Sequence, residues 1–375
     1  MKRLECLDGL RGVLAVYVML GHMAPFAMLP DRLIRLLSHG GAAVDVFFIL
    51  SGMVIVQSLE SFGWHARGFL VARVARTYPV YLVMLALAVP VQALPTDFGR
   101  LPWIGAGSLA RDIWSVGWPR AWGIELLTHL TMTQGLLPDS VVPGGWVSFL
   151  GSAWSLSTEW QFYLLALGIG MAIGPRRMTP AFLLLAVAGL LWQAAAPAGL
   201  AFSRAFLPNK AQFFALGIAS AGLLRGETVR RYAAVLVLTL VFCAAELRWE
   251  KLLPPLVWTV CLAAQLRPDR GVLRPLALLL RSRLLLWLGA LSYCIYLTNE
   301  PVEKVLGLAL AACVGGNGVA FSAVWLPGAV VLPVLVSVGL HRWVETPALH
   351  RGRRYARQIA GAAALEARPG TVAVR

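Results

Sequence analysis

The sequence is poor in charged residues, and in acidic ones above all. Only 14% of its 375 residues are charged, and 18 acidic residues stand against 33 basic ones. Hydrophobic residues instead make up 58% of the chain, and the mean hydropathy is +0.71. A soluble protein of this length has too little interior to bury so much apolar surface. The composition therefore excludes a soluble enzyme and predicts an all-α, polytopic membrane protein.

Paired cysteines are also absent. The five cysteines form no CxxC motif, and four of them lie in apolar stretches, where a free cysteine acts as a small packing residue. We therefore expect no disulfide framework, no metal site and no permanently bound cofactor. A cleavable signal peptide is not expected either, because no small-residue cleavage site follows the first apolar run.

About ten hydrophobic segments fit the length of the chain as membrane-spanning helices of about 20 residues each. We place them at residues 8–29, 41–59, 77–94, 153–174, 180–197, 205–224, 231–247, 252–266, 284–304 and 320–341. With the N-terminus inside, the inner segments hold 22 of the 33 Lys and Arg residues and the outer segments hold 9. The positive-inside rule explains this asymmetry and the net charge of +15 better than a nucleic-acid partner does. The chain is predicted to be a multi-pass protein of the cell (inner or plasma) membrane, with both termini cytoplasmic.

The predicted domain organisation is simple. Residues 1–350 form one transmembrane domain with its helices around a central site, and the basic segment 351–375 is a disordered cytoplasmic tail that lies on anionic lipid. The longest loop, residues 95–152, is placed outside and contains five tryptophans. These tryptophans fit either an interfacial aromatic belt or a cap over an outer vestibule that faces sugar or lipid.

The first hydrophobic segment contains two ionisable residues, Arg11 near its start and His22 well inside it. Ionisable groups are costly within a bilayer, so their default interpretation is functional. Eleven residues of helix amount to three turns and about 20°, which places both side chains on one face, about 16 Å apart along the axis. This face would set a cation at the cytoplasmic edge and an imidazole deep in the membrane.

Two carboxylates lie near the outer ends of other predicted spans. Asp45 follows the glycines of HGGAAVDVFFILSGMVI, and Glu159 lies among apolar residues in AWSLSTEWQFYLL. Each also has a structural interpretation, since Asp45 suits a helix N-terminus and Glu159 suits a buried arginine as its partner. Because both enter from outside while His22 rises from inside, all three could meet in the outer half of the bilayer.

Two arginines follow the second span. Arg73 and Arg76 lie in RGFLVARVARTYPVYL, which we interpret as an inner loop. They would either fix the topology or clamp a phosphorylated cytoplasmic ligand, for which arginine offers bidentate contacts.

The last two spans contain further polar residues. In the ninth, Pro301 is expected to kink the helix. A polar stripe there rises to the outer face and supplies the acceptor-side candidates Tyr293, Tyr296, Asn299 and Glu300. In the tenth, Glu345 and Pro347 are expected to end the helix, and Glu345 is expected to hold Arg342 or an arginine of the inner loops.

Taken in order, these motifs resemble the acyltransferase-3 family of integral membrane acyltransferases. The resemblance rests on LDGLRGxxAxxVxxGH and continues through GGAAVDVFFILSGMVI, RVARTYP, WSLSTEWQFY, LGALSYCIYL and RWVETPAL, across roughly residues 4–350. Members of this family modify surface polysaccharides, peptidoglycan-linked sugars, lipooligosaccharides or secondary metabolites.

The resemblance implies a ten-helix core, a cytoplasmic acyl-CoA donor and often an outer acceptor. Acetyl is the commonest acyl group, and the acceptor would be a carbohydrate, a glycolipid or a glycosylated small molecule. The Arg–His pair of the family corresponds to Arg11 and His22, with the histidine as the catalytic residue. The family's inner arginines correspond to Arg73 and Arg76, and its buried glutamate corresponds to Glu159. Many members carry a histidine in a YLxHxP pattern where this chain has Asn299, which cannot act as a base.

The resulting hypothesis is a membrane acyltransferase that takes part in carbohydrate modification. His22 would be the general base or a transient acyl carrier, and Asp45 or Glu159 would fix its tautomer. Arg11, Arg73 and Arg76 would hold the phosphates of acetyl-CoA or another acyl-CoA. The alternative is a proton-coupled transporter or flippase for a sugar or lipid, although we find no internal repeat and no pair of broken spans in the sequence.

Overall fold

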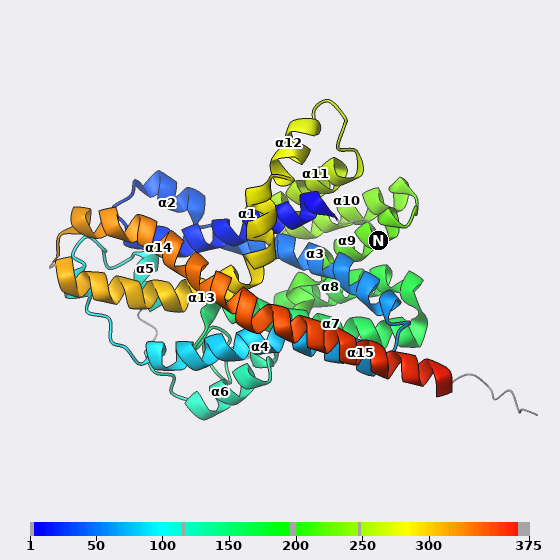
Figure 1. Cartoon of the computed structure of the whole chain (residues 1–375), viewed down its shortest axis with the longest axis horizontal. Helices are drawn as coiled ribbons and strands as arrows, with labels where there is room; N and C mark the ends of the chain where they lie inside the picture. The colour runs from blue at the N-terminus through cyan, green and yellow to red at the C-terminus, as the bar shows by residue number, and fades with distance from the viewer. Residues whose placement is uncertain (1–3, 115–116, 196–199, 247–248, 315, 367–375) are drawn as a thin grey trace, which may run out of the picture.

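The computed structural model describes residues 4–114, 117–195, 200–246, 249–314 and 316–366, and these residues are almost entirely helical (Figure 1). They form the fifteen α-helices α1 (Glu5–Met23), α2 (Asp31–Leu37), α3 (Gly40–Ser61), α4 (Ala66–Gln92), α5 (Leu109–Trp114), α6 (Trp122–Leu130), α7 (Trp154–Ile173), α8 (Met178–Ala195), α9 (Ala211–Leu224), α10 (Val229–Ala245), α11 (Leu253–Leu266), α12 (Arg274–Leu280), α13 (Arg283–Val314), α14 (Gly318–Leu340) and α15 (Thr346–Glu366). The predicted all-α class is confirmed.

The helices differ in their ability to cross a membrane. Within the described residues, five segments are long and apolar enough, namely Glu5–Phe26, Asp31–Ser61, Ala66–Gln92, Pro175–Ala195 and Gly318–Gly361. The pair α12 and α13, bent by 56° at its break, would make a sixth. Helices α9, α10 and α11 coincide with predicted spans but have only 14, 17 and 14 residues. The protein is a polytopic membrane protein, and the count of ten spans stays a prediction.

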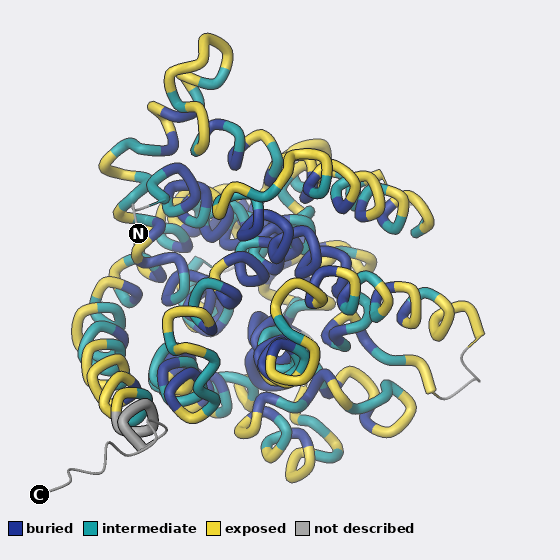
Figure 2. The backbone as a smooth tube through the Cα atoms, turned by 90° about the vertical axis from the view of Figure 1, so that its right-hand side faces the viewer, coloured by how far each residue is buried: buried dark blue, intermediate teal, exposed yellow. Residues whose placement is uncertain are grey.

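Helix α1 lies at the centre of the fold, packed mainly against α13 and flanked by α3 and α11. Glycine allows α1 and α13 to approach closely, because a Cβ added at Gly289 would lie 2.0 Å from the backbone oxygen of Asp8. Figure 2 shows the buried residues gathered along the inner helices, with exposed residues on the outward sides. Large apolar side chains such as Leu184 on α8 and Val241 on α10 are exposed there, as expected of a surface that faces lipid.

Helix α4 begins earlier than predicted. Residues 66–76, which we interpreted as the end of an inner loop, form its first three turns, so Arg73 and Arg76 lie on a helix. The loop interpretation was therefore wrong. The reason is chemical: arginine and alanine both favour a helix, and His65 caps its start by accepting a hydrogen bond from the backbone N–H of Gly68 at 3.1 Å.

The last helices are longer than predicted. Helix α13 runs through Pro301 to Val314. After α14 the backbone continues as a π-helical turn, His341–Glu345, and then as α15, so Glu345 and Pro347 do not end the helix. Residues 351–366, where we expected the tail to fray, are helical and pack along α4 (Figure 1). Residues 367–375 lie outside the described residues.

The outer loop folds over the end of α1. Trp114 is buried, with its ring centroid 3.8 Å from that of Phe26, and Trp103 donates a hydrogen bond from Nε1 to the Phe26 oxygen at 3.0 Å. Trp118 and Trp122 are instead exposed. Some tryptophans of this loop thus pack over the end of α1 and others lie on the surface, and the choice between an aromatic belt and a cap over a vestibule stays a prediction.

Candidate active site

Two adjoining cavities lie beside α1. The first, which we call the inner cavity, has a volume of about 160 Å³ and is lined by the charged residues Arg11, Arg73, Arg76 and Glu159. The second, the outer cavity, has a volume of about 460 Å³ and includes His22 in its wall. Arg11 and His22, which we expected on one face of the helix, therefore line different cavities. Val44 and Tyr296 line both, so the two cavities meet at these side chains.

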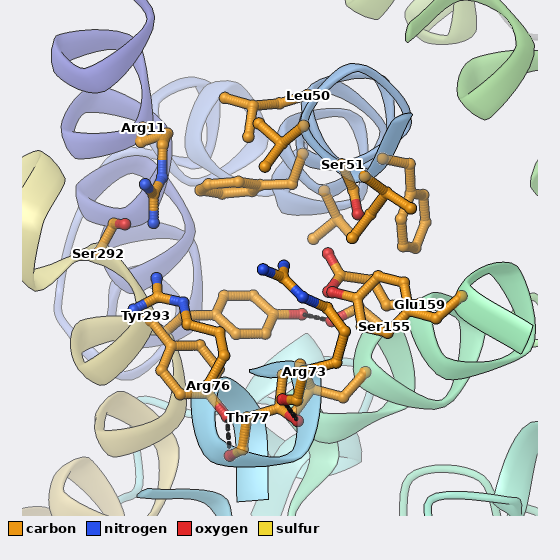
Figure 3. A pocket seen from close by; sticks show the side chains of 18 residues that line it. Arg11, Leu50, Ser51, Arg73, Arg76, Thr77, Ser155, Glu159, Ser292 and Tyr293 are labelled. Atoms are coloured by element: carbon orange, nitrogen blue, oxygen red, sulfur yellow. Dashed lines mark hydrogen bonds between the residues drawn. The ribbon is translucent and has the colours of Figure 1, made fainter. Parts of the chain in front are cut away.

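The inner cavity is surrounded by three guanidinium groups. Arg11 enters from α1, while Arg73 and Arg76 enter from successive turns of α4 (Figure 3). Glu159 faces them from α7, and its carboxylate accepts a hydrogen bond from the Tyr163 hydroxyl. Helix packing thus brings together four charged side chains from three helices that are distant in sequence.

Positive charge exceeds negative charge in this cavity. Arg76 is ion-paired with the buried carboxylate of Glu345. The Nε of Arg73 is buried and has no hydrogen-bond partner among the described residues. The Arg73 guanidinium instead stacks 6.0 Å from the ring centroid of Tyr163. Since desolvated guanidinium groups favour bidentate anions, the cavity is chemically suited to phosphate or carboxylate oxygens.

Glu345 is the anchor for Arg76. Its carboxylate also accepts hydrogen bonds from His341 Nδ1 at 2.7 Å and from Cys294 Sγ at 3.2 Å. The predicted structural role of Glu345 is confirmed. Of the two partners we expected, Arg342 or an arginine of the inner loops, it is the second, Arg76, which lies on α4. The π-helical turn places His341 and Glu345 on one side of the helix, next to α13 and α4.

The outer cavity combines ionisable groups with aromatic rings. Its polar lining includes His22, Asp112, Arg204, Glu300 and Lys304. Its aromatic lining consists of Trp114, Trp146, Phe149, Trp154 and Tyr296. The Arg204 guanidinium lies 4.9 Å from the ring centroid of Trp146. Tryptophan faces next to polar side chains are suited to an amphipathic ligand that presents both C–H faces and hydroxyl groups.

His22 is held by Asn299. The Nδ1 atom of His22 lies 2.7 Å from Asn299 Oδ1 and 3.7 Å from Glu300 Oε1. The amide nitrogen of Asn299 donates to the backbone oxygens of Ile295 at 3.1 Å and Tyr296 at 3.0 Å. Carbonyl oxygens only accept, so this end of the amide must be the NH₂ group and Oδ1 must face the imidazole. Nδ1 therefore carries a proton, and in the neutral imidazole Nε2 is the nitrogen with the lone pair.

Asp45 does not contact His22. Its carboxylate instead accepts from Lys210 Nζ at 2.6 Å and from Lys251 Nζ at 3.2 Å. Glu159 lies in the inner cavity, so neither carboxylate fixes the histidine tautomer, and that prediction was wrong. The expectation that the three residues meet was wrong: Asp45 pairs with two lysines, Glu159 lines the inner cavity and His22 lines the outer cavity.

The acceptor-side candidates separate in the structure. Asn299 and Glu300 lie beside His22, and Tyr296 lies at the boundary between the cavities. Tyr293 lines only the inner cavity and is thus separated from the other three candidates, and its assignment to the acceptor side stays a prediction. The cause is helix periodicity, because residues three apart on α13 differ by about 60° and 4.5 Å in position.

Sequence reasoning missed two groups of residues. Lys210 and Lys251 were counted only as topological charges, although both pair with Asp45. Arg204 and Trp146 come from loops and reach the outer cavity only through the tertiary fold. The sequence contains one signal for Lys210. This lysine directly precedes the apolar segment of α9, and a lysine next to such a segment needs an anionic partner.

Fold and site together define a helical membrane protein with a cation-lined inner cavity and an aromatic outer cavity that has a fixed imidazole in its wall. The acyltransferase-domain family matches residues 4–342, and the chain belongs to this acyltransferase-3 family. The predicted family is thus confirmed.

Two curated proteins are similar to parts of the chain. Acyltransferase MdmB of Streptomyces mycarofaciens is 31% identical over 176 residues, which cover 43% of this chain and 38% of that protein. Protein 2 in the picA locus of Rhizobium radiobacter is 32% identical over 171 residues, or 42% of this chain and 78% of that protein. The chain therefore matches well under half the length of MdmB. No solved structure matches.

Proposed function

We propose that this protein transfers an acyl group, acetyl in the first instance, from cytoplasmic acyl-CoA to a hydroxyl group of an acceptor on the outer side of the cell membrane. The observation that carries the proposal is the position of His22, whose tautomer is fixed and which lies just beyond a cavity with three arginines. Family membership supports an acyl donor and an acceptor. Both termini are cytoplasmic in this proposal.

The inner cavity is the donor site. Arg11, Arg73 and Arg76 would bind phosphate oxygens of the donor, whose pantetheine arm would then extend toward His22. Arg11 and His22 are eleven residues apart on one helix, or about 16 Å along its axis. That separation suits a long, flexible arm with charge at one end and the thioester at the other.

The chemical step needs one base. Nε2 of His22 accepts the proton of the acceptor hydroxyl as its oxygen attacks the thioester carbonyl carbon. The new C–O bond forms, the C–S bond breaks, and the proton passes from the imidazolium to the departing thiolate, which gives the ester and free CoA thiol. Asn299 holds Nδ1–H, and Glu300, 3.7 Å away, stabilises the imidazolium that forms.

The outer cavity is the acceptor site. Tryptophan rings that pack on C–H faces, together with ionisable side chains that bind hydroxyl groups, favour a carbohydrate, a glycolipid or a glycosylated small molecule. The volume of about 460 Å³ is large enough for a sugar unit with its hydroxyl directed at His22.

A transfer assay in membranes tests this proposal. Membranes that contain the protein are incubated with radiolabelled acetyl-CoA, and both free CoA thiol and label in the carbohydrate and lipid fractions are measured. We expect His22→Ala to lower both by at least about 100-fold while the protein remains in the membrane. His39→Ala is the matched control, because His39 precedes α3 and lines neither cavity.

Two results would overturn the proposal. Full activity of the His22→Ala protein would show that His22 is not the base. Movement of a sugar or lipid across the membrane without release of CoA thiol would identify a transporter instead.

A further inference from the structure

Two side chains separate the inner cavity from the outer cavity. Val44 of α3 and Tyr296 of α13 are both buried, and each lines both cavities. The Tyr296 ring lies 6.3 Å from the ring of Phe47, which lines the inner cavity. Its hydroxyl accepts a hydrogen bond from Ser155 Oγ of α7 at 2.9 Å. The tyrosine is therefore fixed at both its ring and its hydroxyl.

This pair lies between the arginines and the base. Tyr296 precedes Asn299 by three residues on α13, and Asn299 binds His22. The side chain of Tyr296 is thus about one turn of helix below the partner of the imidazole. Arg11 lies three turns below His22 on α1 and faces the inner cavity. Val44 and Tyr296 therefore form the wall that the arginine-lined cavity shares with the cavity of His22.

We propose that Val44 and Tyr296 form the constriction through which the acyl thioester passes, and that the Tyr296 side chain limits the size of the acyl group. This inference rests on the proposed function. It assigns to Tyr296 a selective rather than a chemical role, because His22 alone carries the proton in the proposed step and the Tyr296 oxygen accepts the hydrogen bond of Ser155.

The packing explains why size would be selected. Close-packed interiors tolerate little extra volume, so each additional methylene at the constriction must displace a fixed ring. A short acyl group can pass beside the ring, whereas a longer one requires Tyr296 to leave Ser155. Discrimination of about 10- to 200-fold for one methylene is the range that apolar pockets reach.

The experiment compares acetyl-CoA, butyryl-CoA and hexanoyl-CoA as donors for the wild-type protein and for Tyr296→Ala. We expect the ratio of kcat/KM for hexanoyl-CoA to that for acetyl-CoA to rise at least 10-fold in Tyr296→Ala. Val44→Ala should shift the ratio in the same direction by a smaller factor, because it removes less volume. Leu50→Ala is the matched control, since it enlarges only the wall of the inner cavity and should leave the ratio unchanged.

The outcomes separate this inference from the proposed function. Retained acetyl transfer by Tyr296→Ala with an unchanged ratio would overturn the constriction and leave the acyltransferase assignment intact. Failure of the wild-type protein to use any of the three donors would overturn the proposed function itself. If Tyr296→Ala does not fold, an unchanged ratio in Val44→Ala overturns the inference and a raised ratio supports it.

Discussion

Asn299 acts on the site without touching the reacting atoms. Its amide is fixed by the carbonyls of its own helix, and this leaves its oxygen as an acceptor for Nδ1–H of His22. A histidine at this position, as in many family members, would offer either a donor or an acceptor. Asparagine offers one orientation only, so it selects a single tautomer of the base.

Replacement of Asn299 by leucine tests this positioning role. Leucine has a similar volume but cannot accept a hydrogen bond, so Nδ1–H loses its partner and the basic nitrogen is no longer held in one place. We expect kcat to fall by about 100-fold while KM for acetyl-CoA stays within about twofold, because the arginines are untouched. Asn299→Asp, which keeps an acceptor oxygen, should restore part of kcat.

The neighbouring residue provides the control. Thr298 hydrogen-bonds to Ser337 of α14 at 2.9 Å and lines neither cavity, so Thr298→Val should leave kcat nearly unchanged. Equal losses in kcat and in the folded amount of Asn299→Leu would indicate a packing role and contradict the positioning role.

At the level of single residues, the sequence indicates which ionisable residues lie on apolar helices, but it does not indicate which residues they contact. That Arg11, His22 and Glu159 lie on apolar helices could be inferred from their neighbours in the sequence. The pairing of His22 with Asn299 spans 277 positions and that of Lys210 with Asp45 spans 165. No local periodicity encodes such contacts, because they depend on how helices cross.

Among the helices, the contact between α1 and α13 determines the site, since α1 carries Arg11 and His22 while α13 carries Asn299. An alanine at Gly289 would place its Cβ 2.0 Å from a backbone oxygen of α1, which cannot move aside without a shift of the whole helix. We expect Gly289→Ala to destabilise the protein by about 1–3 kcal/mol and to lower activity. The midpoint of thermal unfolding in detergent and the transfer assay measure these effects.

Gly168→Ala on α7 is the matched control for this substitution. A Cβ added there meets no atom within 4 Å, and alanine favours a helix by up to about 1 kcal/mol over glycine. A midpoint as high in Gly289→Ala as in Gly168→Ala would show that the two helices are not held by close backbone contact.

Helix α6 of the outer loop contains a buried histidine that should respond to pH. Burial lowers the pKa of His129 to about 4 from its ordinary 6.5. The unfolded chain therefore binds a proton at a higher pH than the folded one, and stability falls as the pH drops from about 6.5 to about 4. A difference of about 2.5 units corresponds to about 3 kcal/mol.

Thermal unfolding between pH 7 and pH 4 measures this effect. The wild-type midpoint should fall across that window, and His129→Gln should show a smaller fall because it removes the titrating group. Tyr81 of α4 donates a hydrogen bond to the His129 oxygen at 2.7 Å, so loss of α6 packing should loosen the outer loop from α4. Identical pH dependence in both proteins would refute the assignment.

The helices themselves were largely predictable, and their ends were not. Each of the ten expected apolar segments overlaps a helix because hydrophobic runs report burial in lipid or protein. The beginning of α4 and the continuation of α14 into α15 were not predicted, because the positive-inside rule led us to assign these basic segments to loops and to a tail. These two segments pack closely on one another, since a Cβ added at Gly68 would lie 3.1 Å from the backbone oxygen of Ala356.

At the scale of the whole molecule, the arginines gather at one end of the helices and the aromatic residues of the loop gather at the other. The exposed arginines of α15, among them Arg353 and Arg354, lie along the part of α4 that carries Arg73 and Arg76. The aromatic cap lies at the other end of α1. The positive-inside rule assigns the arginine-rich end to the cytoplasm. The donor would therefore enter from inside and the acceptor from outside.

Sealed membrane vesicles of opposite orientation test this direction. Acyl-CoA is highly charged and does not cross a bilayer, so it reaches the inner cavity only in inverted vesicles, whose cytoplasmic face is outside. We expect inverted vesicles to release CoA thiol from added acetyl-CoA at least 10-fold faster than right-side-out vesicles of equal protein content. Detergent should abolish the difference by opening both, which controls for sealing. Faster release in right-side-out vesicles would place the arginines on the outer face. Because Arg11 and His22 lie at fixed, separate positions along α1, the whole proposed path would then run in the opposite direction.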